Sequence, residues 1–199
     1  MQKQLAAIVD SMELAQTRLR RLSDKVSEDA WNRQPAPRRW SAANCVEHLN
    51  LTSRAYLPLF RDAIVEARQL RGGPVAHYRK DALGWFMTQM IGPMRHIGKL
   101  RLMKVKTTPP FVPKGGQSRT ELLSEFVRLQ ADIITQIRTA DGLSLDKVKI
   151  VSPFGGHMKY NTYSGMVIVS RHQHRHIDQA EEAAGGREGG AVNLEPPAV

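Results

Sequence analysis

Four long stretches of this chain repeat apolar residues every three to four positions, and this repeat constrains the fold more than any other feature. Two of the clearest sets are Leu5, Ile8, Met12, Ala15, Leu19 and Leu22, and then Leu122, Phe126, Leu129, Ile133 and Ile137. An α-helix turns once in about 3.6 residues, so each set lies along one side of a helix and needs a neighbour to cover it. Four such segments predict an all-α four-helix bundle.

Residues with known preferences for helix ends separate these segments. Ser41 is a good N-cap for the second helix, which we expect to run to about residue 69, with Pro58 kinking or splitting it. The sequence SRTE at 118–121 has the form of a capping box and begins the third helix. The remaining elements that we expect are a shorter helix at 81–90, a short strand at KVKIV (147–151) and a fourth long helix at about 162–184.

The chain has 199 residues, which is enough for one domain with a real core, and we expect this domain to cover residues 1–184. The Gly- and Pro-rich residues 185–199 lack an apolar period and are predicted to be a flexible tail. Cys45 is the single cysteine, which excludes an internal disulfide and fits a reducing compartment. No apolar run approaches a membrane span or a signal peptide, so we expect a cytoplasmic protein that does not interact with membranes.

The net charge of +10 is unevenly distributed along the chain. Residues 91–119 hold seven Lys or Arg, and no acidic residue lies between Asp81 and Glu121. This basic stretch is either a solvated connection or a surface that attracts an anionic substrate, a membrane or nucleic acid. A nucleic-acid-binding module is the weaker interpretation, because such modules use stacking groups and Phe111 is the sole aromatic residue here.

The segment RHQHRHIDQA (171–180) places three of the seven histidines within five positions. On a helix His172 and His176 are about 40° apart and continue the apolar side, so both face the core. His174 points about 200° away from His172, toward the polar side, where we expect it to face solvent. Two imidazoles on successive turns can share one metal ion.

A third ligand has to come from another helix, and His48 is the best candidate because it lies beside the apolar side of the second helix. The other histidines, in loops or basic segments, are His77, His96 and His157. A set of His48, His172 and His176 leaves coordination positions open, as catalytic sites do. Asn44, one turn before His48, is predicted to support the ligands from outside.

Three imidazoles suit a divalent ion such as zinc, nickel or iron, and copper is a further alternative. Such an ion lowers the pKa of a bound water or thiol and favours a small anionic or thiol ligand. Glu47 and His157 are candidates for a general base. The alternative to an enzyme is a non-catalytic metal-binding or stress-related structural protein.

Three segments resemble the DinB/YfiT-like superfamily of four-helix metalloproteins. They are AWNRQPAPRRWSAANCVEHLN (30–50), VSPFGGHMKYNTY (151–163) and HQHRHIDQA (172–180). The resemblance spans about residues 5–184 and implies an up-down-down-up bundle that is often a homodimer. It places the family's metal histidines at His48, His172 and His176. Gln179, three residues after the last of them, is predicted to support the ligands from outside, like Asn44.

The same resemblance implies the kind of reaction. Members of this superfamily include S-transferases that use thiols such as bacillithiol or mycothiol, and proteins described as metal-dependent hydrolases. Many members have two adjacent histidines followed by Arg-Gly-Gln, whereas this chain reads RHIDQ at 175–179. The metal positions are kept, but the sequence does not assign the chain to one thiol-transferase branch.

Overall fold

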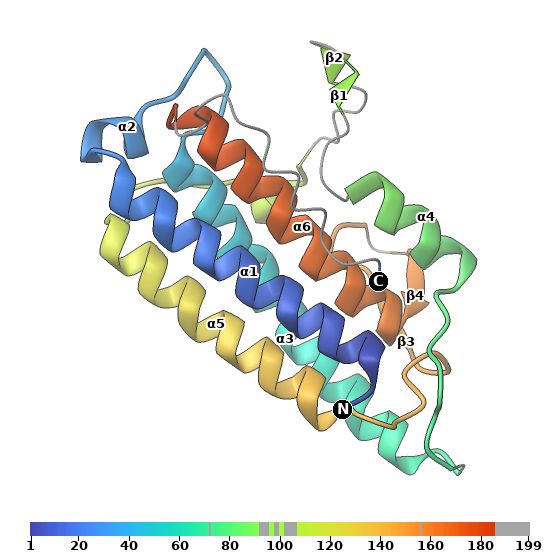
Figure 1. Ribbon diagram of the computed structural model, residues 1–199. Helices are drawn as coiled ribbons and strands as arrows, with labels where there is room; N and C mark the ends of the chain where they lie inside the picture. The colour runs from blue at the N-terminus through green and yellow to red at the C-terminus, as the bar shows by residue number, and fades with distance from the viewer. Residues whose placement is uncertain (72, 92–95, 98–99, 102–106, 156, 186–199) are drawn as a thin grey trace.

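The computed structural model describes residues 1–71, 73–91, 96–97, 100–101, 107–155 and 157–185. Four long helices form most of it: α1 (Lys3–Lys25), α3 (Ala42–Gln69), α5 (Arg119–Thr139) and α6 (Thr162–Ala183). Helices α1 and α6 run in one direction and α3 and α5 in the other (Figure 1). The predicted all-α bundle with up-down-down-up order is therefore confirmed.

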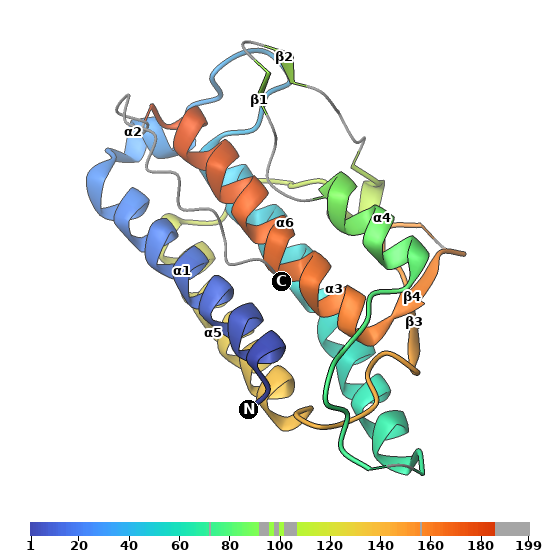
Figure 2. The same ribbon diagram turned by 45° about the vertical axis from the view of Figure 1, so that its right-hand side comes forward.

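Each long helix packs against two others around the core. Helix α3 lies against α5 and α6, and α1 lies against the same two helices from the other side (Figure 2). The apolar sides predicted for α1 and α5 are buried in this core. This arrangement brings the first half of α3 next to the second half of α6, where the histidines lie.

The predicted helix starts are correct in detail. Ser41 and Ser118 each accept a hydrogen bond from the backbone three residues later, and the side chains of Asn44 and Glu121 complete the two capping boxes. Pro58 does not split α3, which continues through it to residue 69. A missing N–H removes only one bond from the ladder of a long helix, and packing on both neighbours keeps α3 in one piece.

The connections contain the smaller elements. Helix α4 and strand β3 appear where the sequence predicts a short helix and a strand. The elements α2, β1, β2 and β4 were not predicted, because all four are too short for a periodic signal. Their bounds, with those of the remaining elements, are α2 (Glu28–Asn32), α4 (Ala82–Ile91), β1 (His96–Ile97), β2 (Leu100–Arg101), η1 (Pro109–Phe111), β3 (Lys149–Val151) and β4 (Lys159–Asn161). Strands β3 and β4 pair antiparallel, with Ile150 opposite Tyr160.

The long connection between α3 and α5 allows these two helices to run parallel. It contains the basic stretch 91–119, much of which lies outside the described residues, as does the tail from residue 186 onward. Within the described part of the chain, no helix combines the length and the apolar character that crossing a bilayer requires.

Candidate metal centre

His48 of α3 meets His172 and His176 of α6 inside the bundle. One ring nitrogen from each lies within 4.8 Å of those of the other two. The ring centroids are 4.4 to 5.1 Å apart, and the rings meet edge to face. All three side chains are buried, with 3 to 8% of their surface exposed. The residues that the helical pattern selected are therefore brought together, and they could hold a metal ion.

The orientation of the His48 ring is fixed by a backbone contact. Its Nδ1 lies 2.7 Å from the carbonyl oxygen of Phe111, and because a carbonyl can only accept, Nδ1–H is the donor. The neutral ring then carries its lone pair on Nε2, which points toward His172. Metal-binding histidines commonly donate their second nitrogen to a carbonyl in this way.

The nitrogen spacing fits a shared ion. His48 Nε2 and His172 Nε2 are 3.3 Å apart. Two nitrogens bound at 2.0–2.1 Å with tetrahedral geometry are separated by about 3.3–3.4 Å. In addition, Nδ1 of His176 is buried without a hydrogen-bond partner among the described residues. A buried nitrogen left in this way costs about 1–3 kcal/mol, and an ion bound to this nitrogen would offset the penalty.

Aromatic side chains surround the three imidazoles. The Trp40 ring lies 4.9 Å from that of His48 and 5.7 Å from that of His176, and Phe154 lies 5.5 Å from His172. Phe111 in turn packs on Phe154. These rings exclude water, which strengthens electrostatic interactions at the nitrogens.

The environment keeps the three imidazoles neutral. Burial lowers the pKa of His48 from its usual 6.5 to about 4, although the bond to the Phe111 carbonyl opposes the shift. Burial also lowers the pKa of His172 and of His176 well below the usual value, and repulsion from the neighbouring imidazoles and Arg175 adds to it. Only a neutral imidazole can bind a metal, so the site is ready for one at neutral pH.

We expect the metal-free protein to lose stability as the pH falls below about 6.5. The folded pKa values are depressed, so in this range the unfolded chain binds protons that the folded chain does not. His48 alone should cost about 2 kcal/mol at pH 5, from 1.36 kcal/mol per pH unit. Urea unfolding at pH 8, 7, 6 and 5 measures the effect, and His48→Gln should remove the contribution of His48 to this pH dependence while those of His172 and His176 remain. Equal stability of the wild type at pH 7 and pH 5 would contradict it.

The other described histidine side chains do not belong to this group. His77 and His157 are exposed, and the side chain of His96 lies outside the described part of the structure. His174 was expected to face solvent, and that expectation is wrong, because it is 3% exposed. The polar side of α6 faces α1 instead of water, and it is covered by Ser11 and Arg18.

A hydrogen-bonded network explains the burial of His174. Its Nε2–H donates to the Ser11 carbonyl at 2.9 Å, and Arg18 donates to its Nδ1 at 3.2 Å. Arg18 also donates to Asp178 and Glu181. Helical spacing separates polar from apolar sides, but it does not reveal that another helix covers the polar one.

The predicted supporting residues have distinct positions. The Asn44 side chain accepts from Ser41 in the capping box, and Gln179 lies beside His176, where it opposes the lowering of that pKa. Among the described side chains, the Glu47 carboxylate is not part of the histidine group, and it accepts from the backbone of Lys114 and Gly115. The role of the Phe111 carbonyl could not be predicted from the sequence, because a backbone acceptor 63 residues from its donor leaves no side-chain pattern.

Comparison with known proteins adds the family. No curated protein and no solved structure matches the chain. The model of the DinB superfamily matches residues 11–180, a range that contains α3 and α5 in full and most of α1 and α6, and that includes His48, His172 and His176. A match over most of the chain, on a helical bundle with this histidine cluster, agrees with the resemblance found in the sequence. This protein belongs to the DinB superfamily.

Proposed function

We propose that this protein binds one divalent metal ion through His48, His172 and His176 and uses it to activate water or a low-molecular-weight thiol. The observation that carries the proposal is the convergence of three buried neutral imidazoles with no fourth histidine, cysteine or carboxylate ligand among the described residues. Structural zinc sites are usually closed by four protein ligands, whereas catalytic sites keep a position for water or substrate.

A divalent ion at this position would lower the pKa of a bound water or thiol toward neutral and so supply a nucleophile. The chain contributes the orientation of the ligands. Phe111 holds His48 with Nε2 toward the centre, and Trp40 and Phe154 keep the imidazoles out of bulk water. Three neutral ligands leave the charge of the ion uncompensated, so we propose that its ligand is a small anion or a thiolate.

The reaction class that we propose is hydrolysis or S-transfer. In the first, water adds across a bond of the substrate and breaks it; in the second, the thiol sulfur bonds to an electrophilic carbon, the bond from that carbon to an electronegative atom breaks, and the thiol proton ends on that atom. We do not assign Glu47 as the general base, because both of its oxygens already accept backbone hydrogen bonds. His157 remains a candidate for this role, and His157→Ala tests it by its effect on turnover.

Cobalt-substituted protein provides the test. Titration with a thiol and with a carboxylate, followed by visible absorption, should change the cobalt spectrum if a coordination position is open. Assays of thiol conjugation to an epoxide and of ester hydrolysis, with and without metal, then separate the two reactions. An unchanged spectrum with every anion between pH 6 and 9 would mean a closed site, and the non-catalytic structural role would replace this proposal.

We also propose that the protein is a homodimer, because members of the superfamily that it resembles are often homodimers. Light scattering should then give about twice the 22.3 kDa of one chain. A mass of one chain at every concentration tested would contradict the dimer without affecting the metal site.

A further inference from the structure

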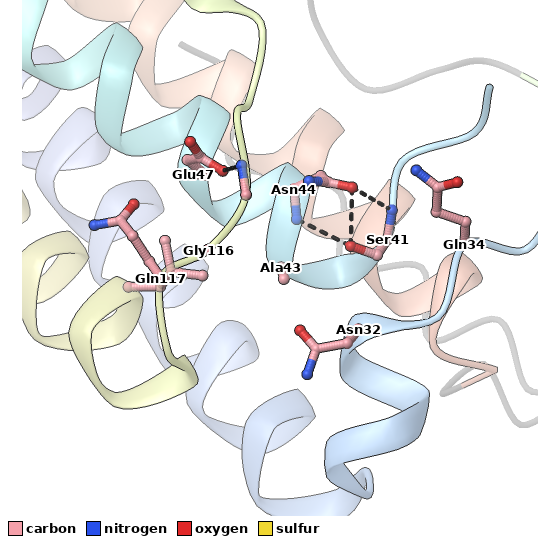
Figure 3. A pocket seen from close by; sticks show the side chains of 10 residues that line it. Asn32, Gln34, Ser41, Ala43, Asn44, Glu47, Gly116 and Gln117 are labelled. Atoms are coloured by element: carbon pink, nitrogen blue, oxygen red, sulfur yellow. Dashed lines mark hydrogen bonds between the residues drawn. The ribbon is translucent and has the colours of Figure 1, made fainter.

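Glu47 precedes His48 on α3, but its carboxylate holds a different part of the chain. Its Oε1 accepts from the Lys114 N–H at 2.8 Å and its Oε2 accepts from the Gly115 N–H at 2.9 Å. Figure 3 shows Glu47 directed at this backbone, with the bond to Gly115 as a dashed line. The side chain is 8% exposed and lines a pocket of about 230 Å³ beside the N-termini of α3 and α5.

The segment that Glu47 holds also carries the partner of His48. Phe111, whose carbonyl accepts from His48 Nδ1, lies three residues before Lys114. Two consecutive residues of α3 therefore form hydrogen bonds with the backbone of residues 111–115, a segment that we call the strap. Glu47 holds its end and His48 contacts its beginning.

The strap is short, and proline restricts its backbone. Pro109 and Pro110 form η1 with Phe111, and Pro113 fixes a further φ angle inside the strap. The Phe111 ring packs on Phe154 at the beginning of the strap. At the other end Gly115 has φ of +75°, a left-handed conformation that glycine adopts most readily. Only Val112 and Pro113 separate Phe111 from Lys114, so a shift at Lys114 has few torsions in which to be absorbed before it reaches the Phe111 carbonyl.

We propose that Glu47 is a positioning residue for the metal centre, acting through the strap and the Phe111 carbonyl on the His48 ring. A carboxylate suits this role because both of its oxygens accept, and two consecutive N–H groups face them. Glutamine would turn an NH₂ donor toward one of these N–H groups and lose that bond. This role rests on the proposed metal function, because orienting His48 matters for binding an ion. The orientation of the His48 ring itself can be measured without metal.

The first test uses the metal-free protein. Nitrogen-15 NMR of the histidine rings should show His48 of the wild type protonated at Nδ1 and bare at Nε2. In Glu47→Gln we expect a mixture of the two tautomers, because the carbonyl no longer holds the ring. The matched control is Glu66→Gln, which removes an exposed carboxylate from the same helix and should leave the His48 signals unchanged. An unchanged His48 tautomer in Glu47→Gln would overturn the positioning role.

The second test measures zinc affinity by competition with a chelator. Loss of a supporting contact typically weakens metal binding about 10- to 100-fold, and we expect this for Glu47→Gln. The loss of the negative charge of Glu47 could also weaken zinc binding. Gly115→Ala distinguishes this effect of charge from an effect of the position of the strap. It keeps Glu47 and has open space for the added Cβ, but it strains the left-handed backbone of the strap.

We expect Gly115→Ala to weaken zinc binding about fivefold and to mix the His48 tautomers as well. Gly73→Ala is the control, because its Cβ also meets nothing within 4 Å and its φ is not positive. Weaker binding in Glu47→Gln with wild-type behaviour of Gly115→Ala would assign the effect to charge and overturn the inference. A wild type that binds no zinc would contradict the proposed function alone, since the tautomer measurement would still decide the role of Glu47.

Discussion

His172→Ala is expected to weaken the binding of a divalent ion by more than about 100-fold, because it removes one of only three protein ligands, and changes in supporting residues alone cost 10- to 100-fold. His48→Ala and His176→Ala should have effects of the same size, since each supplies one nitrogen to the same cluster. Metal content after dialysis against a stoichiometric amount of zinc measures the effect, with circular dichroism to show that the helices are retained.

The chain offers two kinds of control for this experiment. His157→Ala removes an exposed histidine and should leave the zinc content at that of the wild type. His174→Ala removes a buried histidine that does not belong to the cluster, so it should lower stability but keep the zinc. If all three ligand variants retain wild-type zinc, the site is not where we place it.

Arg18→Met is expected to destabilise the protein by about 2–3 kcal/mol. Arg18 connects α1 to Asp178 and Glu181 of α6, and the three side chains are only 17 to 20% exposed. Removing one partner of a fully buried ion pair leaves a charge uncompensated and costs about 3–5 kcal/mol. We expect a smaller loss here because the three side chains are partly exposed to solvent, which screens their charges. The variant also removes the donor to His174 Nδ1. Urea unfolding at pH 7.5 measures the loss.

Arg138→Met is the matched control for Arg18→Met. Arg138 of α5 also forms an ion pair with α1, through Glu13, but these two side chains are 56% and 54% exposed. An exposed pair contributes about 0–1 kcal/mol, so this variant should be close to the wild type. Equal effects of the two substitutions would mean that the network around His174 is not the stabilising contact that its burial suggests.

The sequence predicted the bundle well because its signals are local. The apolar period of Leu5 to Leu22 and the capping residues Ser41 and Ser118 determine where helices form, and both kinds of signal act within a few turns. The pairing of His172 with His176 follows from the same helical geometry. The prediction of His48 also depended on its position next to the apolar side of its helix, because that position directs it toward the core.

What the sequence could not predict depends on contacts between distant segments. The side of α6 with His174 is polar, but whether water or α1 covers it depends on how the helices pack. The bond from His48 to the Phe111 carbonyl and those from the strap to Glu47 involve backbone atoms, which every residue has. The sequence therefore indicated Glu47 as a candidate base, whereas the structure gives its carboxylate two backbone partners.

The most direct measurement of the central claim is an anomalous difference map from crystals grown with one equivalent of zinc. We predict a single strong peak in each chain, about 2.0–2.1 Å from one nitrogen each of His48, His172 and His176. In that map Nδ1 of His48 should remain bonded to the Phe111 carbonyl. A peak at other residues, or no peak while His48 and His172 stay hydrogen-bonded to each other, would contradict the claim that these three histidines form a metal site.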